Sequence, residues 1–168
     1  IDNIFDRLNR NGERLNGQEL RKSKYHGSEL LLLVERIAED SFWKCRLDQT
    51  DVARMEHYEF VSELLFQQIE GKPLHANQSE LDRLYEECTK KQLNWGEVER
   101  IFLEITNYMS GLGIDYDKYR IGGVSHLYGL WCLSNFCLTN KISIDSIRYK
   151  LNNFYVELRS SDLKNVDV

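Results

Sequence analysis

The polar residues nearest the start of the sequence have the types and spacing that could bind an anion. Within the N-terminal segment, residues 4–21, four residues could contact a phosphate or a carboxylate: Arg7, Asn9, Arg14 and Arg21. A guanidinium group offers five N–H donors in a planar fork that matches an oxyanion, and a side-chain amide adds further donors. A helix N-terminus beside them would favour the same charge. This segment is therefore the candidate nucleotide- or phosphate-binding site.

A helix–turn–helix would position these side chains, and a second set of residues in the segment has the properties that it needs. That set comprises Phe5, Gly12, Leu15, Asn16 and Glu19. Gly12 tolerates the positive φ of a turn, and Asn16 with Glu19 has the three-residue spacing of a capping box at the start of a helix. Phe5 and Leu15 would join the apolar contact between the two helices. Turn and cap chemistry explains this set without a ligand, although Glu19 could pair with one of the arginines instead.

Beyond this segment the sequence is typical of an all-α protein. Further helices are expected to begin near Ser28, Asp51, Ser79, Asn94, Ser125 and Ser143. The stretch Ser125–Leu138 is apolar nearly all round, which indicates a helix in the centre of a bundle. We expect one bundle-like domain of about seven to eight helices. It would comprise the helix–turn–helix at residues 1–27, the bundle at 28–160 and a polar tail at 161–168.

Composition and charge narrow the function classes. The net charge is −5, but the first 24 residues hold six basic and four acidic side chains, so an anionic partner would meet the N-terminal segment. The longest apolar run, Leu30 to Val34, is too short to span a bilayer. The cysteines have no Cys-x-x-Cys pair, which favours a reduced, cytoplasmic protein with buried thiols.

Most familiar catalytic patterns are missing from the sequence. It has no phosphate-binding glycine loop and no His-Glu-x-x-His zinc motif, so we assign no catalytic residue and no metal ligand. Glu56, Glu59 and Glu63 share a helix face, which we interpret as solvated rather than metal-binding. A second aromatic and basic group, Tyr116, Tyr119 and Arg120, either stacks against a phosphate-bearing ligand or anchors a loop onto the bundle.

The N-terminal segment resembles the second signature block of the GmrSD restriction endonuclease N-terminal domain family. The residues that carry the resemblance are Phe5, Asn9, Gly12, Leu15, Glu19 and Arg21, followed by Tyr25-His26-Gly27. Arg54, Glu59 and the stretch Phe154–Leu158 are similar to later helices of the family. The resemblance implies the helical lobe of a larger α/β plus α protein.

The resemblance also implies a bacterial, nucleotide-dependent defence protein that restricts or senses modified DNA. In it, Phe5 would pack against an upstream α/β lobe or partner chain, Asn9 would lie near the nucleotide, and Arg7, Arg14 or Arg21 would neutralise phosphate. The intact protein would use a nucleoside triphosphate with Mg²⁺. This sequence lacks the family's Asp-Gly-Gln-Gln-Arg motif and its nuclease motif. We therefore expect the chain to hold no cofactor and to be inactive alone.

A second function class is compatible with the same residues. The chain would then be a non-catalytic helical module for protein–protein interaction, in which the N-terminal segment has only a structural role. Its partner would be another helix or a second copy of the chain. Nucleotide or DNA binding that weakens steeply with salt would distinguish the first class from this one.

Overall fold

The computed structural model describes residues 15–75 and 77–164, the side chains of the last four excepted. Within these ranges the chain forms helices and connecting loops and no strand. The helices are α2 (Gly17–Lys24), α3 (Glu29–Ala38), α4 (Ser41–Arg46), α5 (Glu56–Glu70), α6 (Gln78–Lys90), α7 (Trp95–Gly111), α8 (Val124–Thr139) and α9 (Ile144–Lys164). The all-α prediction is confirmed. No helix in the described part is both long and apolar enough to cross a bilayer.

Short polar side chains set where most of these helices begin. The side chains of Asn16, Ser28, Asn77 and Asn94 each accept a hydrogen bond from a backbone N–H in the first turn that follows. Such caps satisfy donors that a helix leaves without an internal partner. The predicted helix starts at Asn16, Ser28 and Asn94 are therefore confirmed.

Two buried tryptophans lie at the centre of the core. The Trp43 ring from α4 and the Trp131 ring from α8 are fully buried, with their centroids 5.7 Å apart. Each indole N–H has an acceptor, since Trp43 donates to the Thr106 hydroxyl (3.1 Å) and Trp131 to the Gln67 carbonyl oxygen (3.0 Å). Because each indole N–H has a hydrogen-bond acceptor, both large rings are buried without an unpaired donor.

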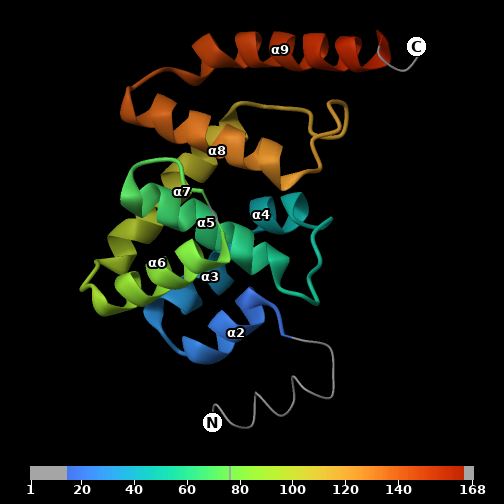
Figure 1. Cartoon of the computed structure of the whole chain (residues 1–168). Coiled ribbons are helices and arrows are strands. Elements are labelled where there is room, and N and C mark those ends of the chain that lie inside the picture. The colour runs from blue at the N-terminus through green and yellow to red at the C-terminus, as the bar shows by residue number, and fades with distance from the viewer. Residues whose placement is uncertain (1–14, 76, 165–168) are drawn as a thin grey trace.

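The helices form an elongated stack with α2 near one end and α9 at the other (Figure 1). Helix α2 packs against α5 and α6, α3 lies against α5, and α8 packs along α7. The loop between α7 and α8 and the end of α4 lie on the same side of the stack (Figure 1). Helix α2 and the end of α4 thus belong to different parts of the stack (Figure 1).

The fold differs from the sequence predictions at four helices. Helix α5 begins at Glu56 rather than at Asp51, because Met55 has a left-handed backbone (φ 62°) that a helix cannot include. Helix α8 is not buried all round, since Phe136 is 60% exposed. Helix α9 continues to Lys164, so the first four residues of the predicted polar tail are helical. Helix α4 was not predicted from the sequence, because six residues are too few for a periodic pattern.

Candidate functional site

The start of α2 has the capping geometry that the sequence predicts. The Asn16 side-chain oxygen accepts from the Glu19 backbone N–H (2.8 Å), and the Glu19 carboxylate accepts from the Asn16 backbone N–H (2.6 Å). Both side chains also contact the loop before α5. The Asn16 amide donates to the Arg54 carbonyl (2.6 Å), and the Arg54 guanidinium lies 3.3 Å from the Glu19 carboxylate. The cap therefore also ties the N-terminal segment to the bundle.

Arg21, one of the four predicted anion ligands, is enclosed by acceptors of the protein itself. Its guanidinium donates to Glu59 on α5 (2.6 Å) and to Asp82 on α6 (2.8 Å). The side-chain oxygens of Gln18 and Gln78 accept from it at 2.9 Å each. The Arg21 side chain is only 2% exposed. An anion could reach this guanidinium only by displacing a carboxylate, so the geometry favours a structural role. We call these five residues the Arg21 network.

A buried hydroxyl pair extends the Arg21 network into the core. The Tyr85 hydroxyl accepts from the Gln18 amide (3.3 Å) and lies 2.6 Å from the Ser62 hydroxyl. Gly17 leaves room for the Gln78 side chain in the Arg21 network, because a Cβ atom at position 17 would lie 1.8 Å from the Gln78 side-chain oxygen. Neither Gln78 nor Asp82 was recognised from the sequence. Only their helical spacing on α6 could have indicated a shared face, and nothing local pointed to Arg21.

The prediction of a solvated glutamate face on α5 is wrong for two of its three members. Glu56 is exposed, but Glu59 is paired with Arg21 and its side chain is 26% exposed. Glu63, half-buried one turn further along, has its pKa raised to about 7 by burial and by the Glu59 carboxylate, with Arg21 opposing the shift. The physical reason is that α2 packs on this side of α5. Within the described ranges, no cluster of three or more acidic, His or Cys side chains could hold a metal ion.

Leu15 of the predicted set is partly buried, and the remaining residues of the predicted site lie outside the described residues. These are Phe5, Arg7, Asn9, Gly12 and Arg14. Their predicted roles stay predictions. The described part brings Asn16, Glu19 and Arg21 together at one end of the bundle, where each contacts α5, α6 or the loop before α5.

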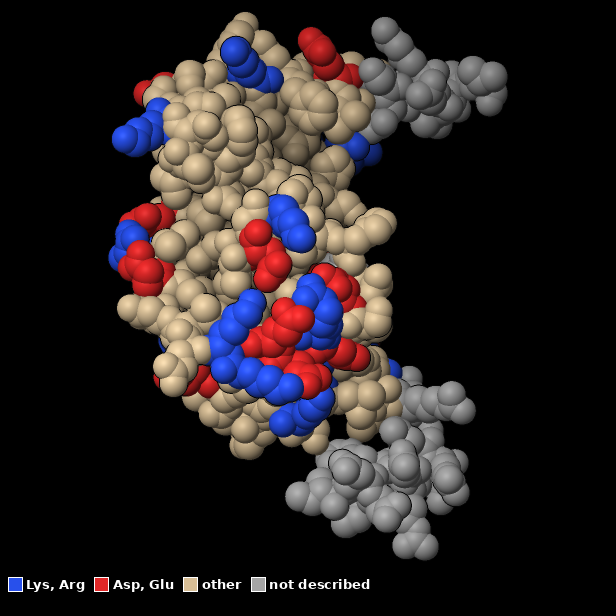
Figure 2. Space-filling model, turned by 60° about the vertical axis from the view of Figure 1, so that its left-hand side comes forward, with Lys and Arg blue, Asp and Glu red and all other residues tan. Residues whose placement is uncertain are grey.

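Charges on the visible face of Figure 2 are interleaved rather than separated by sign. Blue and red side chains cluster together in the lower part of that view, whereas the upper part carries few charges. On α6, Arg83 pairs with Glu80 (2.7 Å) and Glu87 (2.6 Å), and Lys90 pairs with Glu86 (2.5 Å). Paired surface charges of this kind do not form a basic surface for nucleic acid.

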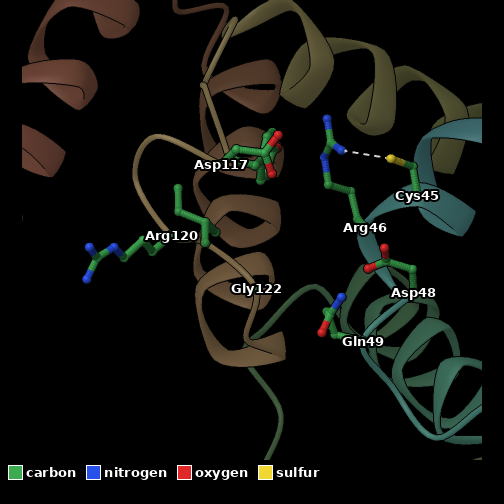
Figure 3. A pocket seen from close by; sticks show the side chains of 9 residues that line it. Cys45, Arg46, Asp48, Gln49, Asp117, Arg120 and Gly122 are labelled. Carbon is green, nitrogen blue, oxygen red and sulfur yellow. Dashed lines mark hydrogen bonds between the residues drawn. The ribbon is translucent and has the colours of Figure 1, made fainter.

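A cavity of about 590 Å³ lies between the end of α4 and the loop that joins α7 to α8. We call it the Arg46 cavity. Its polar lining residues are Cys45, Arg46, Asp48, Gln49, Asp117 and Arg120 (Figure 3), and the Tyr116 ring completes one wall. Against the expectation of buried thiols, Cys45 is exposed.

Aromatic rings hold the Arg46 side chain in this cavity. Its guanidinium lies 3.9 Å from the centroid of the Tyr116 ring and 5.3 Å from that of Phe42. One nitrogen donates to the Cys45 sulfur (3.3 Å), but the Nε–H group is buried without a hydrogen-bond acceptor among the described residues. The Tyr116 hydroxyl is likewise buried without a partner there. Burial raises the Tyr116 pKa, and the Arg46 charge offsets part of the rise.

The two interpretations of the Tyr116–Arg120 loop apply to different residues. Tyr119 is buried, stacks on Tyr155 of α9 with centroids 5.4 Å apart, and donates to the Asn152 side-chain oxygen (3.1 Å). It therefore anchors the loop. Arg120 lines the cavity, but its side chain extends away from Arg46 (Figure 3). The Tyr116 ring contacts the Arg46 guanidinium of α4, a partner that sequence spacing could not indicate.

Comparisons with known proteins identified no relative of this chain. The chain matched no protein-family model, no curated protein and no solved structure.

Proposed function

We propose that this chain is the helical portion of a GmrSD-type, nucleotide-dependent DNA restriction or modified-DNA-sensing protein. In this proposal the chain contributes one wall of a nucleotide or phosphate site, and the bundle holds that wall in place. The observation that carries the proposal is the attachment of α2. Asn16, Glu19 and Arg21 belong to the predicted segment, and Glu19 and Arg21 also carry the family resemblance. All three are fastened to the bundle by hydrogen bonds and ion pairs of 2.6–3.3 Å.

Arg21 has a changed role in this proposal. Its donors are engaged by Glu59, Asp82 and two glutamines, so it fixes α2 against α5 and α6. Contact with the anion then falls to Arg7, Asn9 and Arg14. The nucleoside triphosphate with Mg²⁺, the DNA and an α/β lobe or partner chain remain parts of the proposal. Hydrolysis would need the Asp-Gly-Gln-Gln-Arg motif, which this sequence does not contain.

Binding of a Mg²⁺–nucleotide complex and of duplex DNA over a series of salt concentrations tests the proposal. We expect binding that weakens as salt rises and that is lost when Arg7→Gln and Arg14→Gln are combined. Arg100→Gln on α7 is the matched control, because Arg100 is an exposed arginine paired only with glutamates of its own helix. Binding that is equal in the double variant and the control, or rapid nucleotide hydrolysis by the chain alone, would contradict the proposal.

The second candidate function is a helical interaction module, which one specific observation favours. Apolar side chains are exposed at the α8–α9 end of the molecule: Phe136 (60%), Tyr149 (72%), Phe154 (54%) and Val156 (48%). Self-association through this end would bury them. Sedimentation equilibrium of the wild-type chain and of Phe136→Ser with Phe154→Ser tests it. A concentration-dependent dimer that the substitutions abolish would support the module, and a monomer at all concentrations would exclude self-association.

A further inference from the structure

Arg46, unlike Arg21, has no counter-ion among the residues that the structure describes. Arg21 forms ion pairs with two carboxylates, whereas Arg46 forms none in that part of the chain. The Arg46 guanidinium contacts the Tyr116 and Phe42 rings, which are nearly perpendicular to each other (82°), and these contacts restrict its orientation before any ligand arrives. A pre-oriented guanidinium is suited to bidentate pairing with a carboxylate. This group is therefore prepared to receive an oxyanion.

The rest of the cavity is not suited to an isolated anion. Asp117 faces Arg46 across the cavity, and Asp48 lies beside the end of α4 below it (Figure 3). Arg120 also lines the cavity, but its side chain extends away from Arg46 (Figure 3). A free phosphate dianion would gain from Arg46 but would be repelled by both aspartates. The lining is complementary to a molecule that carries a negative and a positive group a short distance apart.

We propose that the Arg46 cavity binds a small zwitterion of the amino-acid type. Its carboxylate pairs with the Arg46 guanidinium, and its ammonium group pairs with the carboxylates of Asp48 and Asp117. The cavity volume of about 590 Å³ lies in the range of small-molecule sites and leaves space for the ligand's own side chain. Because two carboxylates face one guanidinium, neutral and basic amino acids fit better than acidic ones.

Saturation-transfer NMR with the wild-type chain and pools of free L-amino acids tests this proposal, followed by calorimetric titration of each amino acid that gives a signal. The charge requirement is measured with two derivatives of the best binder. The C-terminal amide lacks the anion, and the N-acetyl form lacks the cation. We expect each derivative to bind roughly ten- to hundredfold more weakly than the free amino acid. L-glutamate is expected to bind more weakly than L-lysine.

Substitutions assign the binding to this cavity. Arg46→Gln is expected to weaken binding roughly ten- to hundredfold, and Asp117→Asn, on an exposed loop position, by about tenfold. Lys118→Gln lies in the same loop at an exposed position that does not line the cavity, so it is the matched control and should leave affinity unchanged. If Arg46→Gln alters the circular dichroism of the fold, Asp117→Asn decides alone. The absence of any amino-acid signal, inorganic phosphate that binds as tightly as the best amino acid, or equal affinity in Asp117→Asn and Lys118→Gln would overturn the proposal.

Discussion

Replacing Arg21 with methionine should destabilise the protein strongly, because Arg21 is the centre of a network that is closed to solvent. Methionine keeps most of the apolar volume of the side chain but removes every donor. The substitution removes the Arg21 donors from the Glu59 carboxylate, whose side chain is 26% exposed and which keeps only the Gln78 amide as a donor (3.0 Å) among the described residues, and from the oxygens of Gln18 and Gln78. Breaking one side of a buried ion pair costs about 3–5 kcal/mol. We expect a value of about 3 kcal/mol, since Glu59 keeps some contact with water.

The two ion pairs of Arg21 should differ in their contributions. Asp82 has a side-chain exposure of 61%, so Asp82→Asn should cost only about 0–1 kcal/mol, the usual worth of an exposed pair. The double variant Arg21→Met, Glu59→Met removes both charges and replaces them with apolar groups. It should recover most of the loss from Arg21→Met, because no unpaired buried charge remains.

Urea unfolding followed by far-ultraviolet circular dichroism measures these free energies. Native-state amide hydrogen exchange shows which part of the protein is destabilised. Detachment of α2 alone would remove the exchange protection of Gly17–Lys24 while the core helices stay protected. A cost of less than about 1 kcal/mol for Arg21→Met, as for an ordinary surface arginine, would contradict the buried role of Arg21 in its network. A double variant less stable than Arg21→Met alone would also contradict it.

Three further predictions follow from local geometry. Asn16→Ala removes the capping box of α2 and should lower the free energy of unfolding by about 1 kcal/mol in urea titrations. Glu63 has a folded-state pKa of about 7 against 4.5 as its ordinary value, so its contribution to stability is complete below pH 4.5 and is lost as pH rises to 7. The loss should be on the order of 3 kcal/mol, and Glu63→Gln should remove this part of the pH dependence. Lys141→Gly should raise stability by about 0.5–1 kcal/mol in thermal unfolding, because the exposed Lys141 has a left-handed backbone (φ 54°) that glycine adopts without strain.

Helix boundaries were predictable where the signal is local. A cap acts within three residues, so Asn16 with Glu19 and Ser28 with Leu31 could be recognised from spacing alone. The start of α5 could not, because the apolar stripe continues through Val52 and Met55 while the backbone turns at Met55. Nothing in the residue type signals that turn, since methionine has no preference for positive φ.

The candidate sites were only partly predictable, because their pairings span long distances in the sequence. The arginines of the N-terminal segment were recognised as unusual, but the partners of Arg21 lie 38 residues away at Glu59 and 61 residues away at Asp82. Similarly, Tyr116 was expected either to stack against a ligand or to anchor a loop, whereas the cation that its ring contacts, Arg46, lies on a short helix with no periodic pattern. Sequence spacing predicts interactions between residues within one helical turn. Pairings between residues far apart in the sequence are set by the fold.

The affinity of the chain for a fluorescent Mg²⁺–nucleotide complex, compared between two double variants, tests the central claim most directly. One variant combines Arg7→Gln with Arg14→Gln, and the other combines Arg21→Met with Glu59→Met. If the anion is bound by the residues before α2 and Arg21 only anchors that helix, the first variant loses nucleotide binding and the second keeps it. Loss of binding in the second variant while the first binds as tightly as the wild-type chain would contradict the account.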